Sequence, residues 1–454
     1  MTVSFTTQAE IRFGYGRSGS VRAPGDVGDM LTGVSGPDEI AARFPVPSFA
    51  RSVEVARNHR RLRRARKKKE PGAAQAFKLA NVDALRGAAG ELRASLIRPL
   101  VSPNGFRERL VRFWADHFTV SARKPGLRFV ANAFVEDAIR PHIGGSFQAL
   151  LRKVETHPAM LVYLDQVSSV GPNSKIGRKR NRGLNENLAR EIIELHTLGV
   201  GGNYRQHDVR QFAKLLTGLA YTFRHGFKFR PAAAEPGAEI VLGKEYGGDP
   251  AKLGDIHAAL DDLAHHPDTA RHIARKLAVH FVSDRPEDAL VAHVEAAFNE
   301  TGGDLLATYE ALLEHPAAWE GFGLKARQPF DFIVAAMRAM DVDPERIANL
   351  ALQPTRLFFA APLRVMGQPF LQAAGPDGWP EGIEDWITPQ GLAARIQWAL
   401  IATNALGRMI DPTKLAQTAL AEAFSPELLK VTARAESRLE GMALVFASPE
   451  FNRR

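Results

Sequence analysis

The stretch from residue 185 to residue 199, Asn-Glu-Asn-Leu-Ala-Arg-Glu-Ile-Ile-Glu-Leu-His-Thr-Leu-Gly, constrains the fold more than any other segment of the chain. Its content of Glu, Leu, Ala, Arg and Ile predicts a helix, and Gly199 stands where glycine commonly ends one. At 100° per residue, one side of this helix carries four hydrogen-bonding side chains: Asn187, Arg190, Glu191 and Glu194. A different, apolar side carries Leu188, Ile192 and Leu195, and His196 projects near it in the last turn.

The polar side of this helix has two interpretations. A loop with five basic residues, Lys175, Arg178, Lys179, Arg180 and Arg182, leads directly into the helix. One interpretation is therefore a solvated acidic helix after a solvated basic loop. The other is a polar face that turns inward as a functional site. Arg190 is also placed to neutralise Glu191 or Glu194 within a purely structural network.

The segment from Phe106 to Val120 shows a second helical pattern. Its apolar residues follow an i, i+3, i+4, i+8 series: Leu110, Phe113, Trp114 and Phe118. His117 falls on the same packed side. A histidine there is usually a satisfied core residue. The alternative is a metal ligand or acid–base group, to which the adjoining Asp116 and the aromatic residues add some weight.

Most of the remaining chain also has helical periodicity. Residues 52–98 predict two helices separated at Pro71-Gly72, and further helices begin at prolines 158, 267, 316 and 449 in the first-turn position. Residues 223–246 are the exception. Phe227 and Phe229 alternate with polar residues, and the apolar residues 240–242, beyond a Glu-Pro-Gly turn, are predicted to pair with them. The sequence therefore predicts a mainly α, multi-helix globular bundle with one small β-hairpin at about 223–246.

The length of 454 residues suffices for a large core, and 45% hydrophobic and 24% charged residues are typical of a soluble globular protein. We divide the chain into an N-terminal helical region (1–100), a central helical core (101–225), and a hairpin with a C-terminal helical region (226–454), within one continuous body. A passage rich in Gly, Pro and Trp, residues 362–386, predicts a long ordered loop of the kind that shapes pockets.

The absence of cysteine excludes disulfides and thiolate metal sites, so any metal needs His, Asp or Glu ligands. The first ten residues show neither a basic nor an apolar signal region, and no apolar run approaches the length of a membrane span. We therefore expect a soluble, cytoplasmic protein. A mature periplasmic protein would look the same.

The net charge of +9 comes from one segment. Residues 57–69 hold nine basic residues and no acidic one, and the rest of the chain has 50 of each. This concentration argues against a dedicated nucleic-acid binder, which usually spreads its phosphate contacts over a face or groove. A basic helix of this kind is most often a solvated face, and the alternative is contact with an acidic partner, another anionic ligand or a membrane surface.

Several motifs, taken in order along the chain, resemble a bacterial family. They are Arg12-Phe13-Gly14-Tyr15-Gly16, Phe113-Trp114-Ala115-Asp116-His117-Phe118, Asn185 to Glu191 continuing to His196-Thr197-Leu198-Gly199-Val200, Leu216-Thr217-Gly218, and Ala447-Ser448-Pro449-Glu450-Phe451. The chain is identified as similar to the family called domain of unknown function 1800. The resemblance implies a large, mainly helical bacterial protein without an established activity. It also implies that many relatives are exported and are encoded beside a family that resembles sulfatases.

Two positions depart from the pattern of that family. The family commonly has a second histidine near the position of Ala115, and a histidine often precedes the Glu-Pro-Gly turn, where this chain has Ala234. If those histidines are metal ligands in relatives, this chain lacks them. A metal site is then less expected here.

The sequence supports two functional hypotheses and leaves open whether the protein is an enzyme. The first is a metal- or carboxylate-dependent enzyme with its site between the His117 helix and the Glu191 helix. Its candidate catalytic residues are His117, Glu191, Glu194, Arg190, Asn187 and His196, and the candidate ligands for a divalent metal are His117, Glu191, Glu194 and His196. The second is a non-catalytic binding or assembly protein that contacts an acidic partner or polyanion through segments 57–69 and 175–182.

Overall fold

The computed structural model describes residues 3–180, 183–222, 226–407 and 410–454, and 64% of the chain is helical. The first helices are α1 (Phe5–Gln8), α2 (Val27–Ser35), α3 (Glu39–Arg43), α4 (Phe49–Lys67), α5 (Ala73–Val101) and α6 (Gly105–His117). The central helices are α7 (Ala131–Phe134), α8 (Phe147–Glu155), α9 (Pro158–Tyr163), α10 (Lys175–Arg180), α11 (Asn187–Glu191) and α12 (Gln206–Leu215). The prediction of a mainly helical protein is confirmed.

The second half of the chain continues in the same way. After the strands come α13 (Leu253–Ala264), α14 (Pro267–Phe281), α15 (Asp288–Glu300), α16 (Leu305–Glu314) and α17 (Pro329–Ala339). Shorter helices follow: α18 (Pro344–Ala348), α19 (Leu352–Thr355), α20 (Ala361–Val365) and α21 (Ile383–Trp386). The last are α22 (Pro389–Ala405), α23 (Pro412–Leu420), α24 (Pro426–Ala433), α25 (Arg438–Ala447) and α26 (Pro449–Asn452).

Four single π-helical turns extend or link these helices: η1 (Ala9–Phe13), η3 (Val135–Ile139), η6 (Ile192–His196) and η9 (Arg356–Ala360). Short 3₁₀ turns make further connections: η2 (Leu127–Phe129), η4 (Arg140–His142), η5 (Gln166–Ser168), η7 (Pro231–Ala233), η8 (Pro316–Ala318) and η10 (Ala421–Ala423). Such π turns often occur at functional sites. One of them, η6, contains His196.

The predicted hairpin region forms two antiparallel hairpins. Strand β1 (Leu219–Thr222) pairs with β2 (Gly226–Phe229), and β3 (Gly237–Val241) pairs with β4 (Lys244–Gly248). The predicted pairing of residues 227–229 with residues 240–242 is wrong, because each strand pairs with its nearest neighbour in the chain. Leu242 and Gly243 join β3 to β4 with φ of 50° and 78°. Two consecutive positive φ angles give the turn that matches the twist of a tight hairpin.

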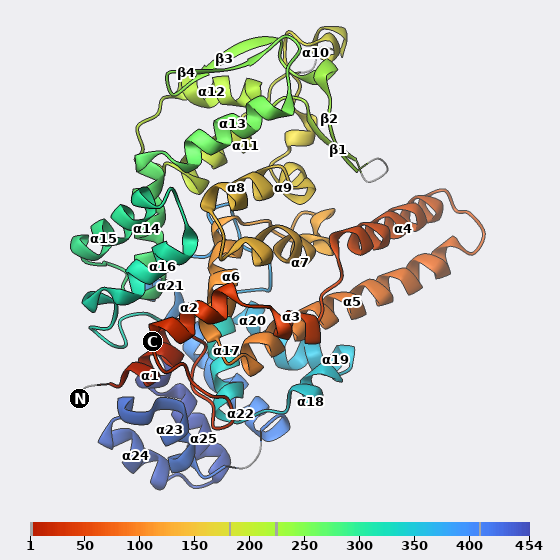
Figure 1. The fold of residues 1–454 in the computed structure, drawn as a ribbon. Coiled ribbons are helices and arrows are strands. Elements are labelled where there is room, and N and C mark those ends of the chain that lie inside the picture. The colour runs from red at the N-terminus through yellow and green to blue at the C-terminus, as the bar shows by residue number, and fades with distance from the viewer. Residues whose placement is uncertain (1–2, 181–182, 223–225, 408–409) are drawn as a thin grey trace.

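Figure 1 shows where these elements lie in the molecule. The strands gather with α10 to α13 at one end, and α22 to α25 form the opposite end. Helices α4 and α5 pair in an antiparallel hairpin that projects from the side of the body, and the turn between them includes Pro71 and Gly72, as predicted. In the described ranges, no helix is both long enough and apolar enough to cross a bilayer.

Prolines begin four of the elements at the predicted joints. Pro158, Pro267, Pro316 and Pro449 each occupy the first turn of α9, α14, η8 and α26. The residue before each of the first three is a histidine whose ring nitrogen accepts a hydrogen bond from the second backbone N–H of the new turn. These His-Pro pairs therefore act as helix N-caps, with the proline at the position where a missing N–H costs nothing.

The core consists of two hydrophobic clusters. The larger includes residues of α6, α8, α14 and α16, and the smaller is centred on α17, α22 and α25. Tyr15 belongs to the smaller cluster and Phe13 to the larger, so the short segment after α1 links the two. The three sequence regions 1–100, 101–225 and 226–454 stay a prediction.

Buried arginines hold irregular segments to this core. Six of the largest fully buried side chains are arginines: Arg12, Arg98, Arg109, Arg327, Arg395 and Arg454. Each of them donates to at least one backbone carbonyl, for example Arg454 to Arg12 and to His280. Satisfying buried carbonyls removes a cost of about 1–3 kcal/mol for each unpaired group, which explains charged residues in the interior.

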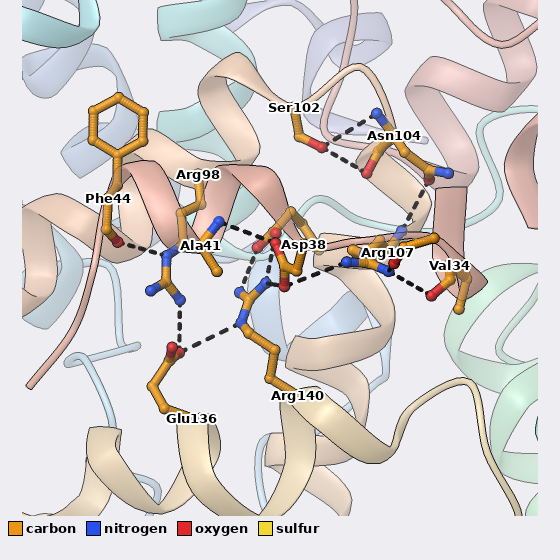
Figure 2. Close-up of polar contacts among 12 residues, drawn as sticks. Val34, Asp38, Ala41, Phe44, Arg98, Ser102, Asn104, Arg107, Glu136 and Arg140 are labelled. Carbon is orange, nitrogen blue, oxygen red and sulfur yellow. Dashed lines mark hydrogen bonds and ion pairs between the residues drawn. The ribbon is translucent and has the colours of Figure 1, made fainter. Parts of the chain in front are cut away.

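An ion-pair network fixes the base of α5 to the body (Figure 2). Arg140 forms a bidentate pair with Glu108, with both distances 2.8 Å, and a bond of 2.9 Å to Asp38. Glu136 joins Arg140 to Arg98 of α5, at 2.6 Å from Arg98. Because Arg140 and Glu108 are almost inaccessible to water, these pairs act in a low dielectric.

Candidate functional site

The central helix is shorter than the sequence predicts. Helix α11 continues through the π turn η6 and ends at His196, three residues before Gly199. The predicted role of Gly199 as the residue that ends the helix is therefore wrong. Gly199 has a φ of 84°, and a Cβ there would lie 2.8 Å from Nδ1 of His272. Glycine at this position permits the close approach of α14.

Three of the four predicted polar-face residues lie at the surface. Asn187 is exposed. Arg190 binds Glu194 at 2.9 Å and Glu186 at 3.5 Å, and the Arg190 and Glu194 side chains are 37% and 22% exposed. No hydrogen bond or ion pair among the described residues connects Asn187, Arg190 or Glu194 to His117. Arg190 and Glu194 thus have the arrangement of the purely structural network that was one of the two interpretations of this face.

Glu191 lies deeper than its neighbours on this face. It is half-buried, and burial raises its pKa, with the charges of Glu194 and Asp377 adding to the rise and His196 and Arg190 opposing it. The charges of Glu191 and Asp377 also help to raise the pKa of Tyr163, after burial. Glu191 therefore lies between the charges of the surface network, Glu194 and Arg190, and those of His196 and Asp377.

The structure brings His117 and His196 together. Their ring centroids are 5.9 Å apart, and Nε2 of His117 donates to the backbone carbonyl of His196 at 3.2 Å. Nδ1 of His196 lies 2.8 Å from Oε1 of Glu155, and both of these side chains are only 1% exposed. Burial, followed by the charge of Lys276, lowers the pKa of His117 well below its ordinary value, so its imidazole is neutral.

This histidine cluster offers no metal-binding set. No group of three or more His, Asp or Glu side chains in the described ranges has the geometry to hold a metal ion. Nδ1 of His117 and Nε2 of His196 are buried without a hydrogen-bond partner there. The roles of His117, His196, Glu191 and Glu194 as metal ligands stay predictions. Within this cluster, the carboxylate that contacts His196 is Glu155 rather than Glu191 or Glu194.

Helix α14 adds a row of residues that sequence reasoning missed. His272, Lys276 and His280 follow at intervals of four, so they share one face of the helix. His272 donates from Nε2 to the carbonyl of Leu195 at 3.0 Å, beside the His117 cluster. Their spacing was a usable signal, but apolar residues at the same period, such as Ile273 and Leu277, made α14 look like a core helix.

Lys276 is the central residue of this row. It is half-buried and forms no ion pair within the described residues. Burial lowers its pKa, whereas the carboxylates of Asp116, Glu381 and Asp377 act in the opposite direction. The Lys276 side chain thus interacts with the carboxyl of Asp116, near the end of α6.

His280 is held by a carboxylate. Its Nδ1 lies 2.5 Å from Oε1 of Glu381, and Glu381 also lies 3.2 Å from the ammonium of Lys325. Burial lowers the pKa of His280 to about 4, so the ring is neutral at pH 7. The bond to the carboxylate requires the proton on Nδ1, which leaves Nε2 as an acceptor. This Nε2 is buried and has no partner in the described ranges.

Asp116 precedes His117 but faces another part of the structure. Its carboxylate accepts the backbone N–H of Trp379 at 3.0 Å. Gly378 has a φ of 83°, and a Cβ there would lie 2.8 Å from Cγ of Asp116, so only glycine permits this contact. Burial and then the charge of Glu381 raise the pKa of Asp116 to about 7, although Lys276 opposes the shift. At neutral pH this carboxyl can both donate and accept a proton.

Asp116 and His280 line one cavity, which has about 50 Å³ of interior space. Its other walls include Tyr15, Arg109, Arg112, Thr119, Gln328, Asp331, Leu371, Ala373 and Trp379. The hydroxyl of Tyr15 is also buried without a hydrogen-bond partner in the described part of the chain. The cavity lies where the two hydrophobic clusters meet, between α6, α14 and α17. Leu371, Ala373 and Trp379 of passage 362–386 line the cavity, as predicted, although the two ends of this passage belong to helices α20 and α21.

The two basic segments lie elsewhere. All nine basic residues of segment 57–69 are exposed, on α4 and the turn that follows it. Lys175, Arg178 and Lys179 of the second segment are exposed on α10. Arg182 lies outside the described residues, as does the side chain of Arg180.

Comparison with known proteins bears out the resemblance found in the motifs. The family model described as Protein of unknown function (DUF1800) matches residues 39–453, which is almost the whole chain. No curated protein and no solved structure shows significant similarity to the chain. The cavity, the histidine cluster and the family motifs thus occur together in one protein, and the chain belongs to the DUF1800 family of proteins of unknown function.

Proposed function

We propose that this protein is a carboxylate-dependent enzyme that performs general acid–base chemistry on a small substrate in the cavity at the end of α6. The supporting observation is that His280 lines this cavity together with Asp116, and that Nε2 of His280 is a buried acceptor with no partner among the described residues. Two titratable groups whose environments push their proton affinities apart are the usual arrangement of an acid and a base. The proposal places the reacting carboxyl at Asp116 rather than at Glu191.

In this proposal His280 is the base and Asp116 is the acid. Nε2 of His280 takes a proton from a water molecule or from the substrate. Glu381, bound to Nδ1, keeps the tautomer that leaves Nε2 free and stabilises the imidazolium that forms. Protonated Asp116 gives its proton to the leaving group of the substrate. The proton that His280 has taken up then returns to Asp116, directly or through water, so protons balance over the cycle.

The other walls of the cavity would bind and orient the substrate. Tyr15 and Arg112 provide donors, and Arg112 is held in place by stacking 4.0 Å from the centre of the Phe330 ring. These donors suit a substrate on which negative charge develops. His117 would act as a positioning residue, because it fixes the carbonyl at the end of η6 and the neighbouring Asp116 through the α6 backbone.

Hydrolysis of p-nitrophenyl acetate and p-nitrophenyl phosphate tests the proposal. We expect turnover above the buffer rate, and a loss of at least about 100-fold in His280→Gln and in Asp116→Asn, the size typical for an acid or base. His157→Gln is the matched control, because His157 is a buried histidine outside the cavity, where it caps α9 and contacts Asp137 at 3.1 Å. Absence of turnover in the wild-type protein, or equal loss in the control, would contradict the proposal.

A further inference from the structure

Helices α4 and α5 form an arm, here defined as residues 57–86, that carries the charge of the whole protein. Between residues 57 and 86 the chain has eleven basic and two acidic residues, a net charge of +9. The formal net charge of the full chain is also +9. The remaining residues are therefore neutral in sum, and the arm is a separate electrostatic element that projects from the body (Figure 1).

The cations of α4 are available for an external partner. All nine basic residues from Arg57 to Lys69 are exposed, and none forms an ion pair in the part of the chain that the structure describes. Arg51 and Glu54, near the base of α4, do form a pair at 2.9 Å. An acidic partner within the chain thus exists for Arg51, but none exists among the described residues for the nine cations from Arg57 to Lys69. Like charges at positions i and i+4 of a helix repel one another. A bound polyanion would therefore stabilise this part of α4.

The cations form a stripe on the side of α4 away from α5. At 100° per residue, seven of them fall within an arc of about 160°: Arg57, Arg60, Arg61, Arg63, Arg64, Lys67 and Lys68. The side toward α5 is fixed by His59, which lies 4.9 Å from the Phe77 ring and binds Asn81 at 2.7 Å. Arg66 stacks on Phe77 at 4.1 Å and lies outside the stripe.

The shape of the stripe indicates its partner. Two walls of phosphates across a groove can meet both flanks of a helix whose cations spread over about 160°. A helix with its side chains is about 10–12 Å wide, and the major groove of B-DNA is about 12 Å wide. From residue 57 to residue 68 the stripe is about 16 Å long. No large apolar side chain lies on it to anchor the arm in a bilayer.

We propose that the arm binds double-stranded DNA through its phosphates, with the outer face of α4 in the major groove. We expect little dependence on base sequence, because phosphate contacts carry no sequence information. The amide of Asn58, the one such side chain between Arg57 and Lys69, already accepts a hydrogen bond from Arg61 at 2.9 Å. The body of the protein, being neutral, adds little, which distinguishes this protein from a dedicated nucleic-acid binder. The network of Arg98, Glu136 and Arg140 holds the base of the arm in place (Figure 2).

The experiment measures binding of the full chain to a fluorescent 20-base-pair DNA duplex by anisotropy between 50 and 200 mM salt. Each phosphate contact contributes about 0.9 to the slope of log affinity against log salt. We expect the triple variant Arg60→Gln, Arg64→Gln, Lys67→Gln to reduce that slope by about 3 and to weaken binding at least about tenfold at 100 mM salt. Glutamine keeps helix propensity close to that of Arg and Lys, so α4 should remain folded.

The matched control removes the same charge from the other basic segment. The variant Lys175→Gln, Arg178→Gln, Lys179→Gln should keep the wild-type slope. The proposal is overturned by equal slopes in the arm variant and the wild type, or by equal effects of the two variants. It is also overturned if the duplex is not bound at 50 mM salt while vesicles with 30% phosphatidylserine, or poly-L-glutamate, are bound. Those results would identify a membrane surface or an acidic protein as the partner.

Discussion

Replacement of Asp116 by Asn should stabilise the protein at alkaline pH and have much less effect at acidic pH. The pKa of Asp116 rises from 3.8 to about 7 on folding, mainly through burial. A carboxyl whose pKa is raised in the folded state costs nothing below its unfolded pKa. It costs progressively more stability as the pH rises toward the folded value, because the unfolded chain then ionises more readily. Asparagine has the same shape and no charge, so it avoids this cost.

The size of the effect follows from the shift. Each pKa unit corresponds to about 1.4 kcal/mol, so between pH 5 and pH 8.5 the full shift changes the stability difference by about 3 kcal/mol. Asp116 is half-buried, and screening by water should reduce this to about 2 kcal/mol. With an unfolding entropy of about 1 kcal/mol/K for a chain of 454 residues, this is a Tm difference of about 2 °C.

Differential scanning calorimetry of the wild type and Asp116→Asn at pH 5 and pH 8.5 measures this difference. The gain in Tm should be larger at pH 8.5 by about 2 °C. Asp377→Asn is the control, since Asp377 is an exposed carboxyl in the same loop and should show no pH-dependent gain. An Asp116→Asn variant whose Tm difference from the wild type is the same at both pH values would refute the reasoning that Asp116 holds its proton near neutrality.

Three further predictions concern packing. Gly378→Ala should lower the free energy of unfolding by about 1–3 kcal/mol, because φ is 83° there and Cβ would press on Asp116, and calorimetry together with tryptophan fluorescence of Trp379 checks it. Arg140→Met should lower the free energy of unfolding by about 3–5 kcal/mol, because it leaves Glu108 buried and unpaired. Arg51→Met, at an exposed pair, should lower it by less than about 1 kcal/mol. Equal losses of Tm in the two variants would contradict this prediction. Phe77→Ala should loosen only the arm, so hydrogen exchange should rise in residues 57–80 and stay unchanged in α6.

The comparison of α4 with the predicted hairpin shows what local sequence can and cannot determine. The helical periodicity of residues 52–98, and the break at Pro71-Gly72, are local properties, and the structure confirms both. The strand pairing between residues 219 and 248 could not be predicted in this way, because two or more strands in this region are possible partners for each other. The positive φ angles of Leu242 and Gly243 form the tight turn that joins β3 to β4, which sequence reasoning missed.

The sequence by itself determined the helical class, the proline-started joints, the location of the net charge and the family motifs, because each depends on residues close together in the chain. It also marked His117 as a candidate, with Asp116 noted only as its neighbour. The tertiary structure decided which groups share the cavity. Asp116, His280 and Tyr15 come from three distant segments, and Glu381 reaches His280 from a fourth. Proton affinity depends on burial and on neighbouring charges, which exist only after the two hydrophobic clusters pack together, so no local pattern could have revealed the acid and the base.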